Sequence, residues 1–124
     1  MSAAAEGRSP SCWVLTEGMA GTENQCLALA AALGLTPDIK RAAAKPLWRW
    51  LGAAMAAVPP NLLAEGSDSL APPWPDLLIA SGRKCAGLAL AIRRASSRRT
   101  FTVFVQNPRF GLGQFDLIVA PRHD

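Results

Sequence analysis

The sequence predicts an α/β domain, a Rossmann-like three-layer arrangement built on a parallel β-sheet. Short apolar segments alternate with helix-like segments along the chain, which is the pattern of strand–helix–strand units. The strands read as continuous apolar runs, which is typical of sheets covered on both faces. Four of the strands run directly into a polar signature that carries Gly or Pro. Since parallel strands end at one edge of the sheet, we expect these signatures to converge on a single site. They are residues 17–25, 81–84, 106–109 and 121–124.

The first strand is expected at residues 11–16, where three apolar residues follow one another. A helix is expected from about residue 23 to 33. Thr22 as N-cap and Gln25 three residues later resemble a capping box, and Gly34 fits the position just after the helix. The apolar stripe expected on this helix is Cys26, Leu29, Ala30 and Leu33.

Residues 38–42 are expected to form a weak strand, mainly because the alternating pattern requires one. Residues 46–58 follow as a helix with Pro at its first turn, and two further prolines end it. The Gly-, Ser- and Pro-rich residues 61–75 read as a connecting loop with at most one turn of helix. The apolar stripe expected on the 46–58 helix is Leu47, Trp50, Leu51, Ala54 and Val58.

Residues 76–80 form the clearest predicted strand, and a helix is expected at residues 83–95. Strands at residues 101–105 and 115–120 complete the set. Right-handed crossovers should then place the helices on both faces of the sheet. The predicted inward side chains of the 83–95 helix are Cys85, Leu88, Ala89 and Ile92. Four arginines crowd its end, where cations complement the helix dipole, so we interpret them as a solvated helix terminus: Arg93, Arg94, Arg98 and Arg99.

Length and composition bound the possible functions. The chain has 124 residues, enough for one domain, and half of them are apolar. A net charge of +4 falls short of a dedicated nucleic-acid binder, but anionic small molecules or a membrane surface remain compatible with it. The three cysteines include no Cys-x-x-Cys pair, which indicates a reducing, cytoplasmic setting. Residues 1–10 read as a disordered tail, and residues 11–124 as a Rossmann-like domain from the front part of a longer protein.

The first signature is a glycine-bearing turn between strand and helix. Gly18 and Gly21 would let a ligand approach the backbone closely, and Asn24 and Gln25 could hydrogen-bond a sugar or a base edge. The turn matches neither Gly-x-Gly-x-x-Gly nor a P-loop, which disfavours a dinucleotide cofactor. The alternative is a turn that merely connects the two elements. Two carboxylates in the same segment would repel a phosphate: Glu17 and Glu23.

The second signature is the best candidate for an anion site. Ser81, Gly82, Arg83 and Lys84 place a hydroxyl, a flexible residue and two cations at the start of a helix. Cations there oppose the helix dipole, so a bound phosphate or carboxylate would explain them. The alternative is a helix cap with two solvated cations.

The last two signatures supply further polar groups. Gln106 and Arg109 follow a buried strand, and the guanidinium could bind a carboxylate or phosphate in a fork or, alternatively, pair with Glu17. Arg122 and His123 follow the final strand, and the histidine, beside an aspartate, is the candidate acid/base group. One histidine without clustered acids gives no metal site. Separately, Trp48 and Trp50 on a basic helix suggest either a membrane or partner surface or, alternatively, core packing.

Together, in this order and spacing, these signatures resemble the mitochondrial-fission Elm-type family of bacterial and plant proteins, over nearly the whole chain after residue 11. The family is sometimes labelled a predicted nucleoside-diphosphate-sugar epimerase, but this chain has no tyrosine for the usual epimerase pair. It departs from the family at Glu17, where Asp is usual, and at Met19, where a basic residue is usual. These departures bear on the ligand role of the first turn.

The resemblance implies the N-terminal half of a GT-B-like glycosyltransferase, with two Rossmann-like domains facing across a cleft. The second domain would grip a nucleotide sugar, and this one would hold an unknown acceptor, with no cofactor. Alone, this half is expected to be inactive. The alternative is a non-catalytic adaptor that binds a protein partner or the periphery of a membrane. In the enzyme reading His123 is the base, and the acceptor side is lined by Ser81, Arg83, Gln106, Arg109 and Arg122.

Overall fold

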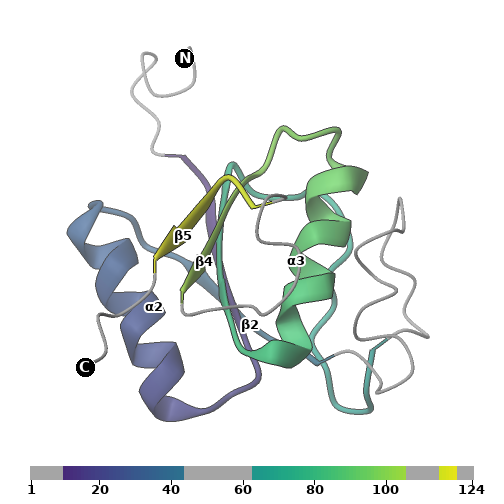
Figure 1. The fold of residues 1–124 in the computed structure, drawn as a ribbon, viewed down its shortest axis with the longest axis horizontal. Coiled ribbons are helices and arrows are strands. Elements are labelled where there is room, and N and C mark those ends of the chain that lie inside the picture. Colours follow the sequence, from purple (N-terminus) through teal and green to yellow (C-terminus); the bar gives the residue numbers. More distant parts are fainter. Residues whose placement is uncertain (1–9, 44–62, 106–114, 120–124) are drawn as a thin grey trace.

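The fold is an open five-stranded sheet with a helix on each face (Figure 1). The computed structural model describes residues 10–43, 63–105 and 115–119. The strand order is β2-β1-β3-β4-β5, and every neighbouring pair is parallel, which confirms the predicted fold class. The elements are β1 (Cys12–Thr16), α2 (Ala20–Ala32), β2 (Asp38–Arg41), β3 (Leu77–Ser81), α3 (Arg83–Ala95), β4 (Phe101–Val105) and β5 (Leu117–Val119).

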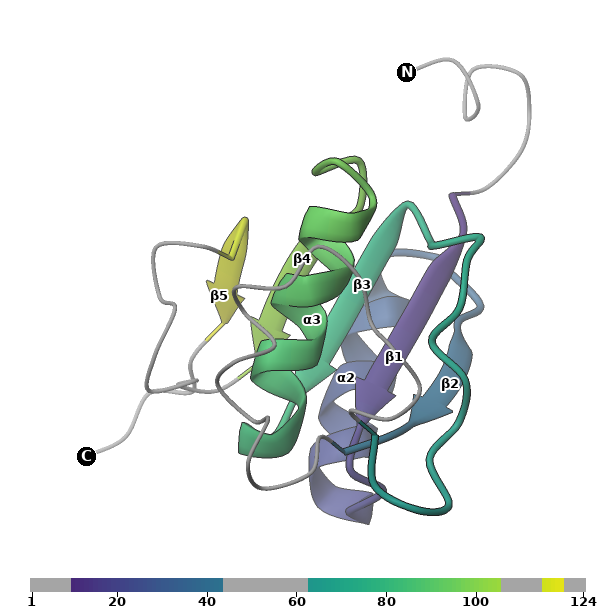
Figure 2. The same ribbon diagram turned by 90° about the vertical axis from the view of Figure 1, so that its right-hand side faces the viewer.

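Helices α2 and α3 lie on opposite faces of the sheet, with α3 in front and α2 behind in Figure 2. Side chains alternate across each strand, so the core divides into two clusters. The larger cluster packs α3 on the sheet through residues such as Leu15, Leu78, Leu88 and Phe104. The smaller cluster packs α2 on the other face, through Val14, Ile79, Val103, Cys26 and Ala30.

Burial follows the position of each strand in the sheet. Every residue of the inner strand β1 is buried, as its continuous apolar run predicts. At the edge, β2 carries charged residues and is mostly exposed, which explains why its sequence pattern is weak. Lys40 of β2 lies over the ring of Trp13, with Nζ 4.7 Å from the ring centroid. Such an arrangement covers the edge of the apolar core with a cation.

The start of α2 differs from the prediction. The helix begins at Ala20 with Met19 as N-cap, and no side chain caps it. Thr22 therefore lies inside the helix, and the predicted capping box does not form. Gly18, at φ +98°, turns the chain directly after β1, so the helix can begin earlier than the Thr22 cap implied.

The end of α2 and most of its apolar stripe were predicted correctly: Cys26 and Ala30 are buried, Leu29 packs against them, and only Leu33 departs from the prediction. Gly34 has φ +75°. Its N–H donates to the Ala31 carbonyl, and the Leu35 N–H donates to the Ala30 carbonyl, which is the Schellman arrangement. Leu33, predicted to face the core, is the C-cap residue that follows the last helical residue, and it is 54% exposed.

The remaining elements match the sequence closely. The predicted bounds of α3 and β4 are those observed, and the predicted inward side chains of α3 are buried. The predicted 115–120 strand is represented by β5, and Phe115 before it packs against Phe104 in the core. Within the 61–75 loop, residues 63–75 form no helix. Leu63, Leu70 and Trp74 of this loop pack on the larger cluster. The predicted 46–58 helix, with Trp48 and Trp50, lies outside the described residues.

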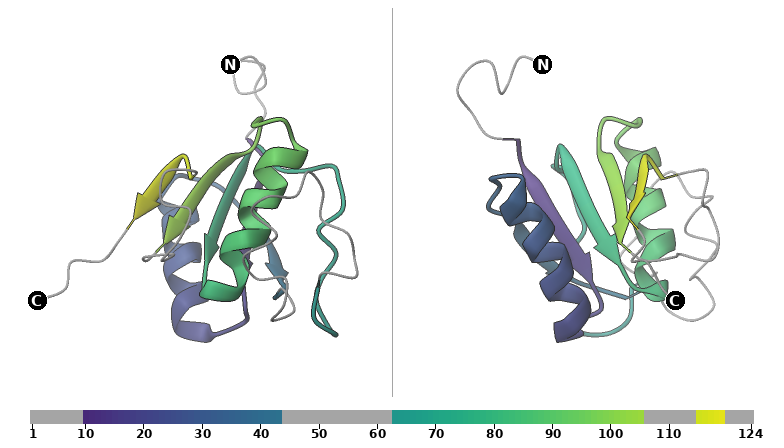
Figure 3. Two further views of the ribbon diagram at one scale, coloured as in Figure 1. Left: turned by 45° about the vertical axis from the view of Figure 1, so that its right-hand side comes forward. Right: turned by 60° about the vertical axis from the view of Figure 1, so that its left-hand side comes forward.

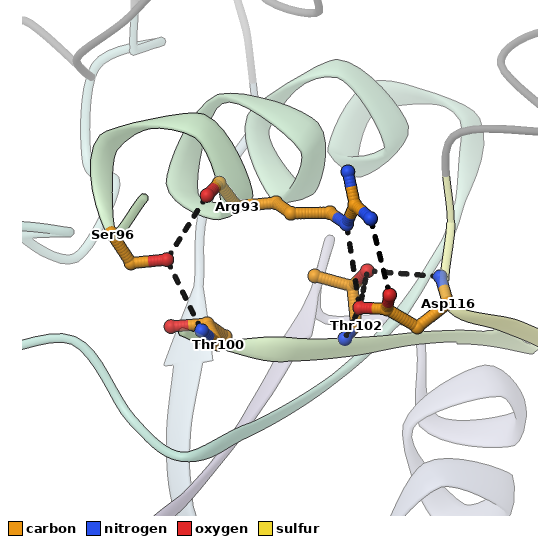
Figure 4. Close-up of polar contacts among 5 residues, drawn as sticks. All are labelled: Arg93, Ser96, Thr100, Thr102 and Asp116. Carbon is orange, nitrogen blue, oxygen red and sulfur yellow. Dashed lines mark hydrogen bonds and ion pairs between the residues drawn. The ribbon is translucent and has the colours of Figure 1, made fainter. Parts of the chain in front are cut away.

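An ion pair anchors β5 at the end of the sheet where the strands begin (Figure 4). The Asp116 carboxylate accepts hydrogen bonds from Arg93 Nε at 3.3 Å and Nη2 at 3.2 Å. It also accepts the Thr102 backbone N–H at 2.8 Å and the Thr102 hydroxyl at 3.1 Å. Arg93 is therefore a structural tie between α3 and β5, which corrects the interpretation of all four arginines as a solvated helix terminus.

Candidate functional site

The strand order places a topological switch point between β1 and β3. The chain leaves β1 toward β2 on one side, while β3 adds on the other side, so the loops after β1 and β3 diverge. In open α/β sheets the crevice at such a point, beyond the carboxyl ends of the strands, is where ligands bind. The candidate site is this edge, where the strand arrows end in Figure 2.

Glu17, directly after β1, reaches across the switch point to the start of α3. Its Oε2 accepts the backbone N–H of Lys84 at 2.9 Å. Lys84 is in the first turn of α3, where backbone N–H groups lack partners within the helix and favour an anion. The carboxylate of Glu17 thus occupies part of the helix terminus that the sequence predicts to bind an anion, and the anion is supplied by the chain itself.

Gly82 makes this contact possible. It is the N-cap of α3 with φ +101°, a conformation that side-chain-bearing residues rarely adopt. A Cβ atom added at this position would lie 2.6 Å from Glu17 Oε2. The glycine of the second signature is therefore explained by the backbone turn and by the close approach of Glu17.

Ser81, at the end of β3, is fully buried, and its hydroxyl donates to the Val105 carbonyl at 2.8 Å. This bond joins the ends of β3 and β4 and uses the only proton that the hydroxyl can donate. A ligand at this edge would therefore contact the surrounding backbone and charged groups rather than the Ser81 hydroxyl.

A second polar network lies on the other side of the β1 turn. Glu23, in the first turn of α2, is 7% exposed. Its Oε1 accepts the Thr16 hydroxyl at 2.9 Å and Arg41 Nε at 3.0 Å, and its Oε2 accepts Arg41 Nη2 at 2.8 Å. The hydrogen bonds from Arg41 lower the pKa of Glu23, against the opposing effect of burial. The carboxylate is therefore held ionised.

Arg41 is held at both its side chain and its backbone. Its N–H donates to Asp68 Oδ2 at 2.7 Å, and its carbonyl accepts the Asp68 N–H at 2.9 Å. The side chain is nevertheless 58% exposed. Within the described part of the chain, only Nε and Nη2 of the guanidinium donate hydrogen bonds, both to Glu23. A fixed, half-exposed guanidinium is a preorganised hydrogen-bond donor.

The structure brings together part of the predicted site. Gly18 lies beside the Glu23 network: its N–H donates to the Thr16 hydroxyl, and a Cβ added to it would lie 3.8 Å from Arg41 Cδ. Gly21, Asn24 and Gln25 are exposed on the first two turns of α2. Arg83 begins α3. The other predicted residues lie outside the described ranges: Gln106, Arg109, Arg122 and His123.

Sequence reasoning missed Arg41 and the structural roles of both glutamates. Glu17 was interpreted as an obstacle to a phosphate or as a partner of Arg109, and Glu23 only as an obstacle. Arg41 lay in the weakest predicted strand. One signal was available, because in a parallel pair the end of β1 lies beside the end of β2. Thr16 and Arg41 are indeed partners in the register. A carboxylate in the following helix turn is then placed to bind both.

Two further kinds of feature are absent among residues 10–43, 63–105 and 115–119: a metal site and a membrane-spanning helix. Within these ranges, no group of three or more His, Cys, Asp or Glu side chains is placed to hold a metal ion. No helix there is long and apolar enough to cross a membrane. What the edge offers is a guanidinium, two carboxylates and exposed amides, which suit the hydroxyl groups of a polar ligand.

Comparison with known proteins identifies the family. The sequence model of the family described as "Mitochondrial fission ELM1" matches residues 20–124. The protein named "Mitochondrial fission protein ELM1" from Arabidopsis thaliana is 44% identical over 50 residues, which are 40% of this chain and only 12% of that relative. No solved structure matches the chain. Because the family match spans residues 20–124 of 124 and includes the signatures at residues 81–84, 106–109 and 121–124, the chain belongs to the Mitochondrial fission ELM1 family.

Proposed function

We propose that this domain forms the acceptor side of a ligand cleft in a larger, GT-B-like glycosyltransferase. The observation that carries the proposal is the contact between Glu17 and Lys84, which bridges the diverging loops after β1 and β3 at the switch point. The cleft would lie along the carboxyl edge of the sheet, where ligands of open α/β folds bind. A second Rossmann-like domain, in the remainder of a longer chain, would hold the nucleotide sugar.

The charges at the edge favour a hydroxylated acceptor here over the phosphates of a donor. Glu17 already places a carboxylate on the start of α3, and a phosphate at the same point would be repelled. Arg41, neutralised by Glu23, would present its remaining N–H groups to neutral oxygen atoms. Asn24 and Gln25 add exposed amide groups on the same helix as Glu23.

In the proposed reaction an acceptor hydroxyl attacks the anomeric carbon of the sugar, and the nucleoside diphosphate leaves. A base removes the hydroxyl proton, and His123 is our candidate for that role. Gln106, Arg109 and Arg122 would complete the wall together with the backbone of residues 81–83. This domain therefore contributes acceptor positioning, and donor affinity would come from the second domain.

Calorimetric titration of the full-length gene product with UDP-glucose, UDP-N-acetylglucosamine and GDP-mannose tests the proposal. We expect binding of at least one donor. We expect Arg41→Ala to leave the donor affinity unchanged but to slow transfer about tenfold, as lost acceptor positioning would. Arg98→Ala, an exposed arginine beyond the opposite end of α3, is the matched control. If no donor produces a heat of binding, the proposal of a glycosyltransferase is refuted.

A non-catalytic adaptor is the second candidate, favoured by the name of the Arabidopsis relative, which refers to mitochondrial fission. Such a protein would bind a partner or a membrane surface and need no acceptor cleft. Partner capture or liposome binding that survives Arg41→Ala and Arg109→Ala, but is lost in Trp50→Ala, would favour the adaptor. Donor binding and transfer that survive Trp50→Ala but are slowed by Arg41→Ala would favour the enzyme.

A further inference from the structure

An apolar strip on β4 and β5 is left uncovered on the side of the sheet that carries α2. We call it the β4–β5 strip, and it consists of Phe101, Leu117 and Val119, which are 48%, 48% and 38% exposed. Leu117 and Val119 lie beside Val103 and Val105 in the parallel register. Val103 and Val105 belong to the core cluster under α2, and Phe101 precedes Val103 by two residues. All three side chains therefore share one face.

The opposite face of β5 is covered. Ile118, between the two exposed residues, packs on the larger cluster beneath α3. On the α2 side, the helix packs over β1 and β3 and does not extend across β5, as the right-hand view of Figure 3 shows. Parallel sheets occur almost only with both faces covered, so among residues 10–43, 63–105 and 115–119 the strip lacks its covering layer.

The dimensions of the uncovered area fit one helix. Neighbouring strands lie about 4.8 Å apart, and packed helices lie about 8–10 Å apart, so each helix covers about two strands. Since α2 covers β1 and β3, a helix packed beside it would lie over the next two strands, β4 and β5. These are the strands that carry the exposed strip.

The residues of the two edge strands, β2 and β5, also indicate that β5 is covered. At the other edge, β2 carries Asp38, Lys40 and Arg41, and such charges discourage pairing with a further strand or chain. β5 is Leu-Ile-Val and has no charged residue of its own. Exposed apolar edge strands are an aggregation hazard that natural proteins avoid by covering them.

We infer that the β4–β5 strip is the docking surface for an amphipathic α-helix contributed by the remainder of a longer chain, packed beside α2. The Arabidopsis relative provides room for such a segment, because the 50 matched residues are only 12% of its length. A second copy of this chain fits less well. The strip offers three side chains per copy, whereas standard interfaces use about 20–30 residues on each side. The inference does not depend on glycosyl transfer.

Thiol reactivity tests the inference, because the native cysteines are buried. Burial raises the pKa of Cys12 and Cys26 to about 11, and that of Cys85 further, which leaves them slow to react. A cysteine is placed in the strip by Leu117→Cys, and in the exposed end of α2 by Leu33→Cys as the matched control. Each is made in the 124-residue chain and in the full-length gene product, and the rate with a disulfide reagent is measured.

We expect the Leu117→Cys thiol to react at least about tenfold more slowly in the full-length product than in the 124-residue chain, as a helix shields it. The Leu33→Cys thiol should react at similar rates in both. Equal rates for Leu117→Cys in the two proteins would overturn the inference. Protection that appears in the 124-residue chain and grows with concentration would assign the strip to a second copy, and would overturn it equally. Neither result bears on donor binding.

Discussion

The carboxylate of Glu17 caps the first turn of α3, with Oε2 2.9 Å from the backbone nitrogen of Lys84, 67 residues along the chain. This bond joins the loops that follow β1 and β3. It accounts for three features of the sequence at once: an acidic residue after the first strand, a glycine after the third, and the lack of a capping side chain at the start of α3.

Removal of the Glu17 carboxylate should destabilise the protein by about 1 kcal/mol, the typical value of a helix-capping side chain. Glu17→Ala loses the acceptor of the Lys84 N–H, and Glu17→Gln keeps an oxygen there and should lose less. Urea unfolding measures the difference. Glu65→Ala, an exposed carboxylate in the loop before β3, is the control and should be neutral. A neutral Glu17→Ala would mean that water caps the helix as well.

Gly82→Ala should cost about 2 kcal/mol, because alanine is strained at a positive φ and its Cβ would collide with Glu17. The two causes separate in a double-mutant cycle. In the Glu17→Ala background the collision is absent, so Gly82→Ala should cost less but should still destabilise. Equal costs in both backgrounds would show that the collision contributes nothing and that the backbone angle alone requires glycine.

The ion pair between Glu23 and Arg41 should make the free energy of unfolding depend on pH. The pKa of Glu23 is lowered in the folded protein, chiefly by the Arg41 hydrogen bonds. Its contribution is therefore present above the unfolded value of about 4.3 and is lost as pH falls through the lower, folded value. The gap in free energy of unfolding between wild type and Glu23→Gln should shrink over that range. A gap independent of pH would contradict the ion pair.

Loss of the Asp116 carboxylate should release β5 before the rest of the sheet. Burial opposes its ionisation, but the hydrogen bonds from Arg93 and Thr102 prevail and lower the pKa of Asp116. Asp116→Ala leaves Arg93 and the Thr102 N–H without this acceptor, at a cost of about 1–3 kcal/mol. Hydrogen exchange should accelerate at the amides of β5 more than at those of β1. Asp38→Ala, an exposed carboxylate at the start of β2, is the control.

The sequence was most informative about the centre of the fold and least about contacts between distant loops. Continuous apolar runs predicted β1, β3 and β4 within a residue, because buried parallel strands need no polar face. The start of α2 was mispredicted because Thr22 and Gln25 imitate a cap locally, whereas Gly18 and the Glu23 network fix the turn. The tie between Glu17 and α3 spans 67 residues. No local sequence pattern predicts this contact, because it forms only when β1 and β3 lie side by side in the sheet.

Hydrogen exchange in the full-length gene product, with and without a nucleotide sugar and a matching acceptor, tests the central claim most directly. The claim is that the carboxyl edge of the sheet at the β1–β3 switch point is the ligand site. It predicts added protection in the turn at residues 16–18 and at the start of α3, with no change at the opposite edge around Asp116. Protection confined to other regions, or none at a saturating ligand concentration, would contradict it.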